Sequence, residues 1–287
     1  MDRPRRSLLF TPANRPSAFD KALNIGADIV CLDLEDAVPP GQKAEVRQQA
    51  IDFLGATGPD HVQRAVRINA LTCQAGIEDL AALLRAAPRD GMVMLPKVSE
   101  AAELQLLDKV LTETGSGLEL SALIETLDGL ENVSDIALAT PRLKLLIFGA
   151  VDFSAELGTE NAQDPMAYAR GRFVHAGKRA GLDVMDVPAL DFRDLEKMKQ
   201  TSNYARALGF TGKAAIHPMG VGVINDAFTP SAEEIAQAQR VIAAFEASPN
   251  GLAVIDGQLI EAPVIKAMQR RLAIASVCAA PETMPDA

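Results

Sequence analysis

The sequence predicts an α/β protein, a (β/α)₈ TIM barrel followed by a C-terminal extension of helix and hairpin. Short apolar runs alternate with amphipathic helical segments along most of the chain, and eight such runs occur before residue 220. Most runs are continuously apolar, as expected of parallel strands that are covered on both faces. The length of 287 residues also suits a barrel of about 250 residues with an appendage.

The expected elements follow one another in strict alternation. Strands are expected at 7–12, 28–36, 63–69, 91–98, 118–126, 143–153, 181–190 and 212–218. Helices are expected at 16–25, 43–54, 76–87, 100–114, 128–139, 165–180 and 193–208. A doubly wound open sheet is the alternative architecture. No GxGxxG motif follows an early strand, so the dinucleotide-binding form of that alternative has no support.

The residues after His217 follow a different pattern. Ser231 is a typical N-cap for a helix over 231–247, because Glu234 stands three residues later. A short β-like hairpin and a further helix are expected after it. We therefore expect a barrel over 1–220 and a C-terminal helix and lid extension over 221–287. A simple packing appendage is the alternative for the extension.

The composition argues against several classes of function. The net charge of −10 disfavours nucleic acid and anionic membranes as partners, because both attract basic surfaces. Cys31, Cys73 and Cys278 are far apart and odd in number, which indicates reduced thiols rather than disulfides or a zinc site. The basic N-terminus lacks the apolar core of a signal peptide, and no stretch approaches the roughly 20 apolar residues of a membrane span. We expect a cytoplasmic protein.

Polar residues stand at the carboxyl ends of the expected strands, and these ends converge on one mouth in barrel enzymes. They are Asp33, Glu35, Asp36, Arg67, Asn69, Lys97, Glu125, Asp152 and His217. Any one of them could be solvated or cap the next helix. Their accumulation on consecutive strands predicts an active site.

Glu125 and Asp152 are expected on adjacent strands. Two carboxylates without nearby cysteine suit Mg²⁺, with Mn²⁺ as an alternative, and the ion would keep waters and substrate oxygens as its other ligands. Asp36 could hold such waters. A glycosidase-like acid/base pair is the alternative, but the chain has no Trp and only 4% aromatic residues for stacking on sugars.

Arg67 is the expected anion partner, because its guanidinium fits a carboxylate or an enolate oxygen. A metal and an arginine beside a developing enolate suit the making or breaking of a C–C bond next to a carbonyl. The turn of Gly149, Ala150 and Val151 would expose N–H groups to an anion.

Two other chemistries have candidates here. Lys97 could serve a Schiff-base aldolase, although the surrounding acids would raise rather than lower its pKa, and His217 is a general-base candidate by residue type.

A series of motifs runs in order along the chain: RRSLLFTPANRP, DIVCLDLEDAV, VRIN, MLPKV, LIET, FGAVDFSAELG, AIHP and IDGQLIEAPVIKAMQRR. From about Arg5 to Ile274, the sequence resembles the citrate lyase β-subunit-like CoA-ester lyases of the HpcH/HpaI aldolase superfamily, which include malyl-CoA lyases and thioesterases. The resemblance implies a TIM barrel, Mg²⁺ and a CoA thioester substrate. It also implies cleavage or formation of a 3-hydroxyacyl-CoA such as malyl-CoA or citryl-CoA through an acetyl-CoA enolate.

The resemblance implies roles for particular residues of the barrel. Glu125 of LIET and Asp152 of GAVD would be the metal ligands. Arg67 of VRIN would hold the substrate or enolate oxygen. Asp36, and with it Asp33, would lie around the waters of the metal.

The resemblance also implies roles outside the metal site. Arg15, in the Arg-Pro pair of TPANRP, would contact the nucleotide end of CoA. Asp256 of the IDG motif would act as acid/base from a neighbouring subunit, which implies a homotrimer or a dimer of trimers. One departure concerns Met219 and Gly220, since relatives often have Gln shortly after IHP.

Three alternatives to a standalone lyase stay open. The protein could be a citrate lyase β subunit acting on citryl-ACP within a larger complex, or a malyl-CoA thioesterase using the same site with water. It could also be a CoA-binding pseudoenzyme that is indifferent to Mg²⁺. The sequence does not name the acyl group or the direction of the reaction.

Overall fold

The computed structural model describes residues 3–56, 58–160, 162, 164–248, 253–255 and 258–278. Two compact units make up the chain: Arg5–Asn225 forms one, and Met1–Pro4 with Asp226–Ala287 forms the other.

The larger unit is a closed barrel of eight parallel strands in sequence order, with β1 also paired to β8. The strands are β1 (Ser7–Pro12), β2 (Ile29–Asp33), β3 (Gln63–Arg67), β4 (Met92–Leu95), β5 (Glu119–Ile124), β6 (Leu143–Phe148), β7 (Asp183–Asp186) and β8 (Gly212–Ala215). This closure confirms the predicted (β/α)₈ fold and excludes the open doubly wound sheet.

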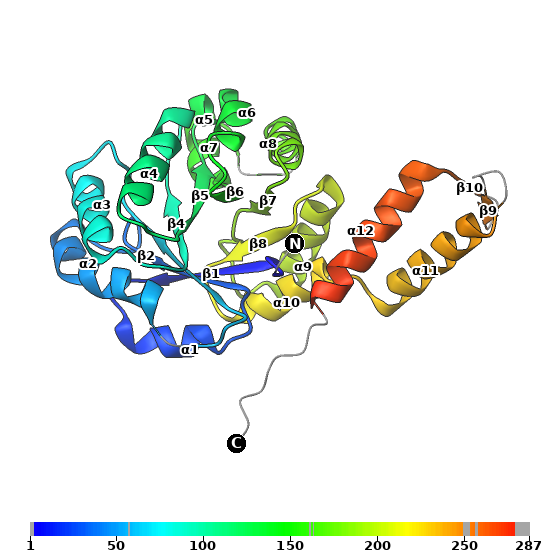
Figure 1. Cartoon of the computed structure of the whole chain (residues 1–287), viewed down its shortest axis with the longest axis horizontal. Helices are drawn as coiled ribbons and strands as arrows, with labels where there is room; N and C mark the ends of the chain where they lie inside the picture. Colours follow the sequence, from blue (N-terminus) through cyan, green and yellow to red (C-terminus); the bar gives the residue numbers. More distant parts are fainter. Residues whose placement is uncertain are drawn as a thin grey trace, which may run out of the picture. The chain divides into compact units, whose positions relative to one another are not determined.

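Helices lie on the outside of the ring of strands (Figure 1). The α-helices are α1 (Phe19–Leu23), α2 (Lys43–Asp52), α3 (Gln74–Ala86), α4 (Ala101–Glu113), α5 (Leu127–Glu131), α6 (Val133–Ala137), α7 (Ala150–Leu157), α8 (Ala167–Arg179), α9 (Leu195–Leu208) and α10 (Met219–Phe228). Short 3₁₀ helices are η1 (Pro16–Ala18), η2 (Pro40–Gln42) and η3 (Phe53–Gly55).

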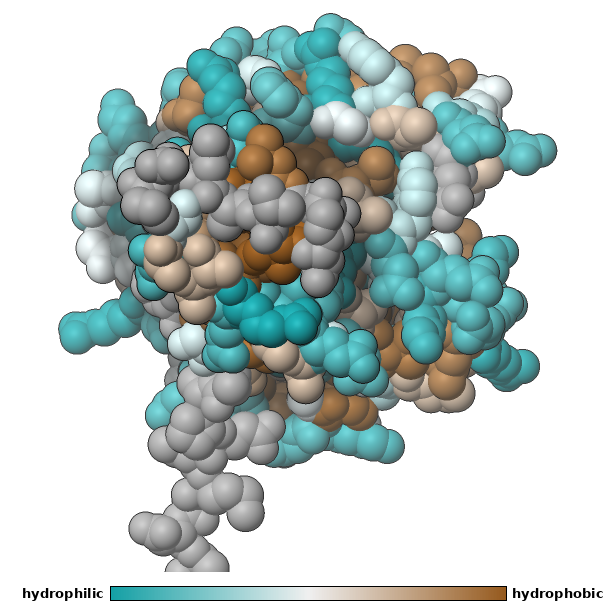
Figure 2. All heavy atoms as spheres, turned by 90° about the vertical axis from the view of Figure 1, so that its right-hand side faces the viewer, coloured by the Kyte–Doolittle hydropathy of each residue, from teal (hydrophilic) through white to brown (hydrophobic). Residues whose placement is uncertain are grey.

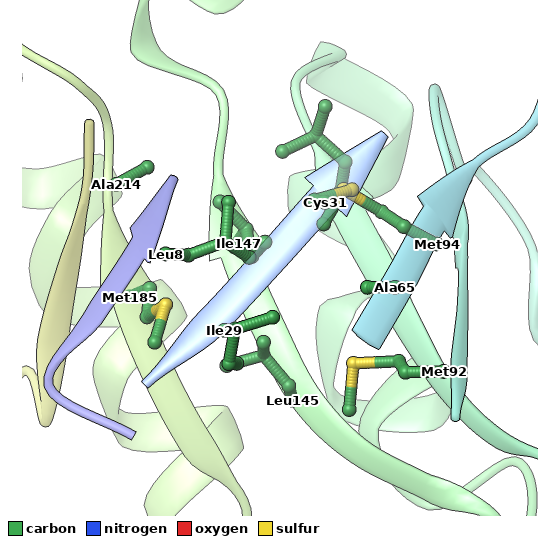
Figure 3. Packing of buried hydrophobic residues seen from close by; sticks show 11 residues of the cluster. Leu8, Ile29, Cys31, Ala65, Met92, Met94, Leu145, Ile147, Met185 and Ala214 are labelled. Carbon is green, nitrogen blue, oxygen red and sulfur yellow. The ribbon is translucent and has the colours of Figure 1, made fainter. Parts of the chain in front are cut away.

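The interior of the barrel is packed with apolar side chains that point inward from the strands (Figure 3). This core consists of Leu8, Ile29, Cys31, Ala65, Met92, Met94, Leu123, Leu145, Ile147, Met185 and Ala214. Side chains on a strand alternate between its two faces, so the residue two positions after an inward one also faces the interior. Asp33, Arg67 and Glu125 each stand two positions after such a core residue, at or just after the ends of β2, β3 and β5. Strand alternation therefore directs these three polar side chains to the carboxyl mouth of the barrel.

Several element boundaries differ from the expectation. The expected strand 143–153 ends at Phe148, and its last residues form helix α7 instead. The expected helix 128–139 is divided into α5 and α6 at Asn132, and α10 was not anticipated. Short apolar runs are ambiguous between strand and helix, because periodicity cannot separate a buried strand from a buried first helical turn.

The smaller unit contains α11 (Ala232–Glu246), a hairpin of β9 (Ala253–Ile255) and β10 (Gln258–Ile260), and α12 (Ala262–Cys278). Helices α11 and α12 lie side by side (Figure 1) and share a small core around Val241, Ile260 and Ile265. The predicted capping box is confirmed. The Glu234 N–H donates to Ser231 Oγ over 3.1 Å, and the Ser231 N–H donates to Glu234 Oε2 over 2.9 Å.

On the face drawn in Figure 2, hydrophilic side chains are interspersed with smaller groups of hydrophobic ones. Of the helices within the described residues, none combines the length and apolar character needed to traverse a lipid bilayer.

Candidate active site

A cavity of about 400 Å³ lies at the carboxyl ends of the barrel strands. One part of its lining is charged and contains Asp33, Asp36, Arg67, Glu125 and Asp152. Another part is apolar and is formed by Phe10, Leu123, Ile147, Val187, Leu190 and Ile216, among others. The structure thus brings together five of the polar residues that the sequence placed at strand ends.

Glu125 follows β5 directly, and only 4% of its surface is exposed. Its Oε1 accepts a hydrogen bond of 3.0 Å from the backbone N–H of Lys97. Burial, together with the negative charges of Glu35 and Asp152, raises the pKa of Glu125 to about 8. Within the described residues, the positive charges near this carboxyl group therefore do not offset its burial and the neighbouring acids.

Gly149 makes room for Glu125. A Cβ atom at position 149 would lie 2.4 Å from Glu125 Cβ and 2.7 Å from Glu125 Oε2, distances that no side chain tolerates. Gly149 is also the N-cap residue of α7. The expected role of this glycine is to open the end of β6. The reason is steric, because a side chain at this position would overlap Glu125, which follows the neighbouring strand β5.

Asp152 does not stand at a strand end as expected. It lies in the first turn of α7, which begins at Ala150, so the anticipated open turn at 149–151 is largely helical. An acid in the first turn of a helix interacts favourably with the partial positive charge of the helix N-terminus. The side chain is 44% exposed, and its Oδ2 lies 3.9 Å from Lys97 Nζ.

Arg67 is held in a fixed orientation by Asp33. Arg67 Nε donates to Asp33 Oδ1 over 2.8 Å, and Nη2 donates to Oδ2 over 2.6 Å. The same Asp33 carboxylate also accepts the N–H groups of Glu35 and Ala37, at 2.9 and 3.2 Å. Asp33 therefore orients Arg67 and fixes the backbone after β2. Within this network, both Asp33 oxygens are already engaged.

Further groups surround the arginine. Its Nη1 lies 3.0 Å from Glu35 Oε2, and its guanidinium carbon lies 5.0 Å from the centre of the Phe10 ring. The Asp36 side chain is 62% exposed, and its Oδ2 lies 3.6 Å from Arg67 Nη2. Burial lowers the pKa of Arg67, but the hydrogen bonds to Asp33 and the nearby acids outweigh it and raise that pKa further. Arg67 is thus a permanent positive charge in the cavity wall.

Lys97 was considered above for Schiff-base chemistry, and its surroundings argue against that role. Its Nζ donates to Glu35 Oε1 over 2.6 Å. Burial lowers the pKa of Lys97, but the Glu35 hydrogen bond and the charges of Glu35, Glu125 and Asp36 raise it above its ordinary value. A lysine that forms a Schiff base needs a neutral amine, whereas this amine is stabilised as ammonium.

His217 contacts Phe192, and the two ring centres are 4.4 Å apart in a stacked arrangement. His217 Nδ1 accepts the N–H of Met219 over 3.2 Å. These contacts favour a structural role, at the start of the loop that leads into α10.

The remaining candidates lie away from the charged cluster or outside the described residues. Arg15 is exposed, stands at the N-cap position of η1 and is not part of the cavity lining described above. Asp256 lies outside the described residues. Met219 and Gly220 are the first two residues of α10, and a Cβ at Gly220 would lie 2.7 Å from Met198 Sδ.

Glu35 and Lys97 are the residues whose importance sequence reasoning underestimated. Both occur in strand-end motifs, LDLED and MLPKV, and that position was their available signal. Their mutual ion pair joins the ends of β2 and β4, which are far apart in the sequence.

Comparison with known proteins places this site in a family. A family model described as HpcH/HpaI aldolase/citrate lyase matches residues 6–218. The chain belongs to this family. An L-malyl-CoA/beta-methylmalyl-CoA lyase of Cereibacter sphaeroides (strain ATCC 17025) is 33% identical over 293 residues, covering 92% of each chain. A (3S)-malyl-CoA thioesterase of C. sphaeroides (strain KD131) is 35% identical over 282 residues, covering 96% of each chain.

Two solved structures are similar to this chain over most of its length. CitE from Mycobacterium tuberculosis, in complex with magnesium, acetoacetate and coenzyme A, superimposes with a TM-score of 0.82 at 32% identity, covering 96% of this chain and 100% of that one. RipC from Yersinia pestis gives a TM-score of 0.71 at 40% identity, covering 80% of this chain and 97% of that one. These relatives confirm the predicted class of enzyme, a CoA-ester lyase with thioesterase activity as an alternative.

The donor set fits the magnesium of this family. Mg²⁺ is commonly bound by one or two carboxylates while water and substrate oxygens complete its shell. Glu125 and Asp152 supply two carboxylates, and the raised pKa of Glu125 shows a demand for positive charge at that point. Among the described residues, no three His, Cys, Asp or Glu side chains form a ready metal cage, so water and substrate would complete the shell.

The metal-free protein is expected to lose stability as the pH rises from about 5 to 9. The pKa of Glu125 is near 4.5 in an unfolded chain and about 8 in the fold, so the folded state holds its proton more tightly. The resulting stabilisation is complete below pH 4.5 and disappears as the pH rises through 8. Urea unfolding in EDTA at successive pH values should show a decline of about 2–4 kcal/mol over this range.

The variant Glu125→Gln provides the control for this pH effect, because an amide has the same shape and does not titrate. Its unfolding free energy should decline distinctly less over the same range. An equally steep decline in the variant would place the responsible titration elsewhere.

Proposed function

We propose that this protein is a magnesium-dependent C–C lyase that cleaves or forms a 3-hydroxyacyl-CoA thioester, with malyl-CoA as the leading substrate. The observation that carries the proposal is the cavity at the barrel mouth, which combines the carboxylates of Glu125 and Asp152 with the oriented guanidinium of Arg67. Malyl-CoA lyases and thioesterases are among its relatives, and M. tuberculosis CitE was solved with magnesium and coenzyme A.

Glu125 and Asp152 would hold the magnesium ion, and Mn²⁺ is an alternative occupant. When bound, the ion supplies Lewis-acid polarisation of substrate oxygens and neutralises negative charge. Asp36, which is largely exposed beside Arg67, is placed to accept hydrogen bonds from water in the cavity.

Arg67 would stabilise the enolate oxygen that develops when the C–C bond breaks. Asp33 occupies Nε and one hydrogen of Nη2, and Nη1 lies 3.0 Å from Glu35 Oε2, so the remaining hydrogens of Nη1 and Nη2 would serve an anionic oxygen. Donors fixed in advance stabilise a developing charge without reorganisation. Val187, Leu190 and Ile216 would offer apolar contacts to the substrate from another part of the cavity lining.

Further parts of the proposal rest on the sequence resemblance alone. Asp256 would protonate the enolate carbon from a neighbouring subunit of a homotrimer or dimer of trimers. Arg15 would contact the nucleotide end of CoA. We also propose a cytoplasmic location, in accord with the thiol pattern of the sequence.

The test is a substrate panel of malyl-, methylmalyl-, citramalyl- and citryl-CoA, each assayed with Mg²⁺ and with EDTA. A lyase releases acetyl-CoA or propionyl-CoA together with an oxo acid, whereas a thioesterase releases the free thiol of CoA. We expect acyl-CoA and oxo acid from malyl-CoA, and no turnover in EDTA. Full activity in EDTA would refute the metal-dependent mechanism, and turnover of none of the four thioesters would refute the proposed reaction.

Two variants of this function have specific support. The thioesterase is favoured by the (3S)-malyl-CoA thioesterase relatives, and release of thiol without oxo acid would identify it. A citrate lyase β subunit is favoured by the M. tuberculosis structure of that description, and activity restricted to a citryl thioester of a carrier protein would identify it.

A further inference from the structure

We propose that Lys97 is the resident counter-ion of the metal site, which holds the carboxylates together in the metal-free protein and opposes the binding of the divalent cation. The inference rests on the proposed function, because it assumes that Glu125 and Asp152 bind the metal. It assigns a role to a lysine that neither Schiff-base chemistry nor the enolate mechanism uses.

The backbone of Lys97 has an unusual conformation that serves the site. Its φ angle is +52°, in the left-handed region that side-chain-bearing residues rarely adopt. Among the described residues, the other non-glycine residue with positive φ is Ala87, the C-cap residue of α3. Lys97 ends no helix. Its N–H points instead at Glu125 Oε1, over 3.0 Å, which is a functional reason for the strain.

The side chain of Lys97 reaches the other acids of the cavity mouth. Its Nζ lies 2.6 Å from Glu35 Oε1 and 3.9 Å from Asp152 Oδ2. Only 7% of the surface of Glu35 is exposed. Its other oxygen, Oε2, lies near Arg67 but lacks a hydrogen-bond donor within the described structure. Lys97 therefore donates the hydrogen bond that this buried carboxylate accepts.

The charged residues at the cavity mouth explain why Lys97, rather than Arg67, can act as the counter-ion. The acids there are Asp33, Glu35, Asp36, Glu125 and Asp152, and the cations are Arg67 and Lys97. The Arg67 fork is occupied by the buried Asp33 carboxylate. Lys97 is 40% exposed at its side chain, so its ammonium can withdraw towards solvent when another cation arrives.

An ion bound by Asp152 would lie close to this ammonium, and two positive charges at such a distance repel each other. Lys97 should therefore weaken the binding of metal alone while it stabilises the metal-free fold. Removing the charge of Lys97 should therefore raise the affinity for Mg²⁺ and lower the free energy of unfolding of the metal-free protein. A merely structural lysine would support both the fold and the metal site, and its loss would weaken both.

The test compares wild type with Lys97→Met by calorimetric titration of MgCl₂, without substrate, and by urea unfolding in EDTA. Methionine removes the charge, keeps the N–H donor and has a similar length, so the left-handed backbone costs the same. We expect about tenfold tighter Mg²⁺ binding by Lys97→Met. We also expect a lower unfolding midpoint without metal.

Two further variants complete the test. Lys97→Arg keeps the charge and should bind Mg²⁺ as weakly as wild type. Lys97→Gly removes the charge and relaxes the left-handed backbone, so it reports metal affinity if the methionine variant does not fold. Equal or weaker Mg²⁺ binding by the uncharged variants would overturn the counter-ion role while leaving the proposed function intact. Absence of Mg²⁺ binding by the wild type and by the uncharged variants alike would overturn the proposed function itself, and this inference with it.

Discussion

The variant Glu125→Gln is expected to lower kcat/KM for cleavage of the CoA thioester at least about 10³-fold and to weaken Mg²⁺ binding strongly. The carboxylate is buried against Gly149 and is aligned by the Lys97 N–H, so no other acid can take its exact place. An amide keeps the shape of the side chain but provides one neutral oxygen instead of an anionic pair. Steady-state kinetics and Mg²⁺ titration would measure the two losses.

Two variants on helix α7 serve as a matched pair for this prediction. Asp152→Asn should reduce Mg²⁺ affinity and kcat/KM in the same way, because Asp152 is the proposed second ligand. Glu156→Gln lies one turn later on α7, where the side chain is exposed, and should leave both nearly unchanged. Wild-type metal affinity in both Glu125→Gln and Asp152→Asn would contradict the assignment of this carboxylate pair.

The variant Arg67→Lys is expected to lower kcat/KM about 10²–10³-fold even though the positive charge is retained. Lysine cannot reproduce the two parallel hydrogen bonds to Asp33, which is 3% exposed. A buried carboxylate that loses a partner destabilises the fold, by about 3–5 kcal/mol when the partner is removed entirely. We therefore expect a lower melting temperature together with the loss of rate.

The matched control for this prediction is Arg64→Lys, the same substitution on the same strand. Arg64 lies on the opposite face of β3 from Arg67, and its Nε makes a long contact of 3.5 Å to the Leu54 carbonyl. Its kcat/KM should stay within about twofold of wild type, since Arg64 faces away from the barrel interior and is not part of the cavity lining. Equal loss of activity in both lysine variants would indicate a general effect on β3 rather than a role for the Arg67 fork.

The sequence predicted the barrel because the deciding signal is local and repeated. Eight apolar runs separated by helical segments permit few arrangements, and continuous burial on both faces favours parallel strands. The same regularity places Arg67 and Glu125 correctly at the cavity, because side chains alternate along a strand and parallel strands end at one mouth. The family followed from the order of the motifs and is confirmed by the relatives.

The boundary between β6 and α7 shows where local reasoning failed. The run KLLIFGAVDF is apolar almost throughout, and nothing in its periodicity marks the change to helix after Phe148. At this boundary a Cβ at position 149 would overlap Glu125, which directly follows the preceding strand, so the glycine is required by a contact that local periodicity does not reveal. Asp152 consequently reaches the cavity from a helix rather than from a strand tip.

By itself, the amino-acid sequence determined the barrel and the mouth at which the acids gather, since both depend on patterns that recur along the chain, and the order of its motifs indicated the class of enzyme by resemblance to a known family. Only the tertiary structure decided how the charges are paired: Arg67 with Asp33, Lys97 with Glu35, and Glu125 with no ion pair among the described residues. The physical reason is that ion pairing and burial depend on distances between segments that are remote in sequence, and local periodicity does not specify those distances.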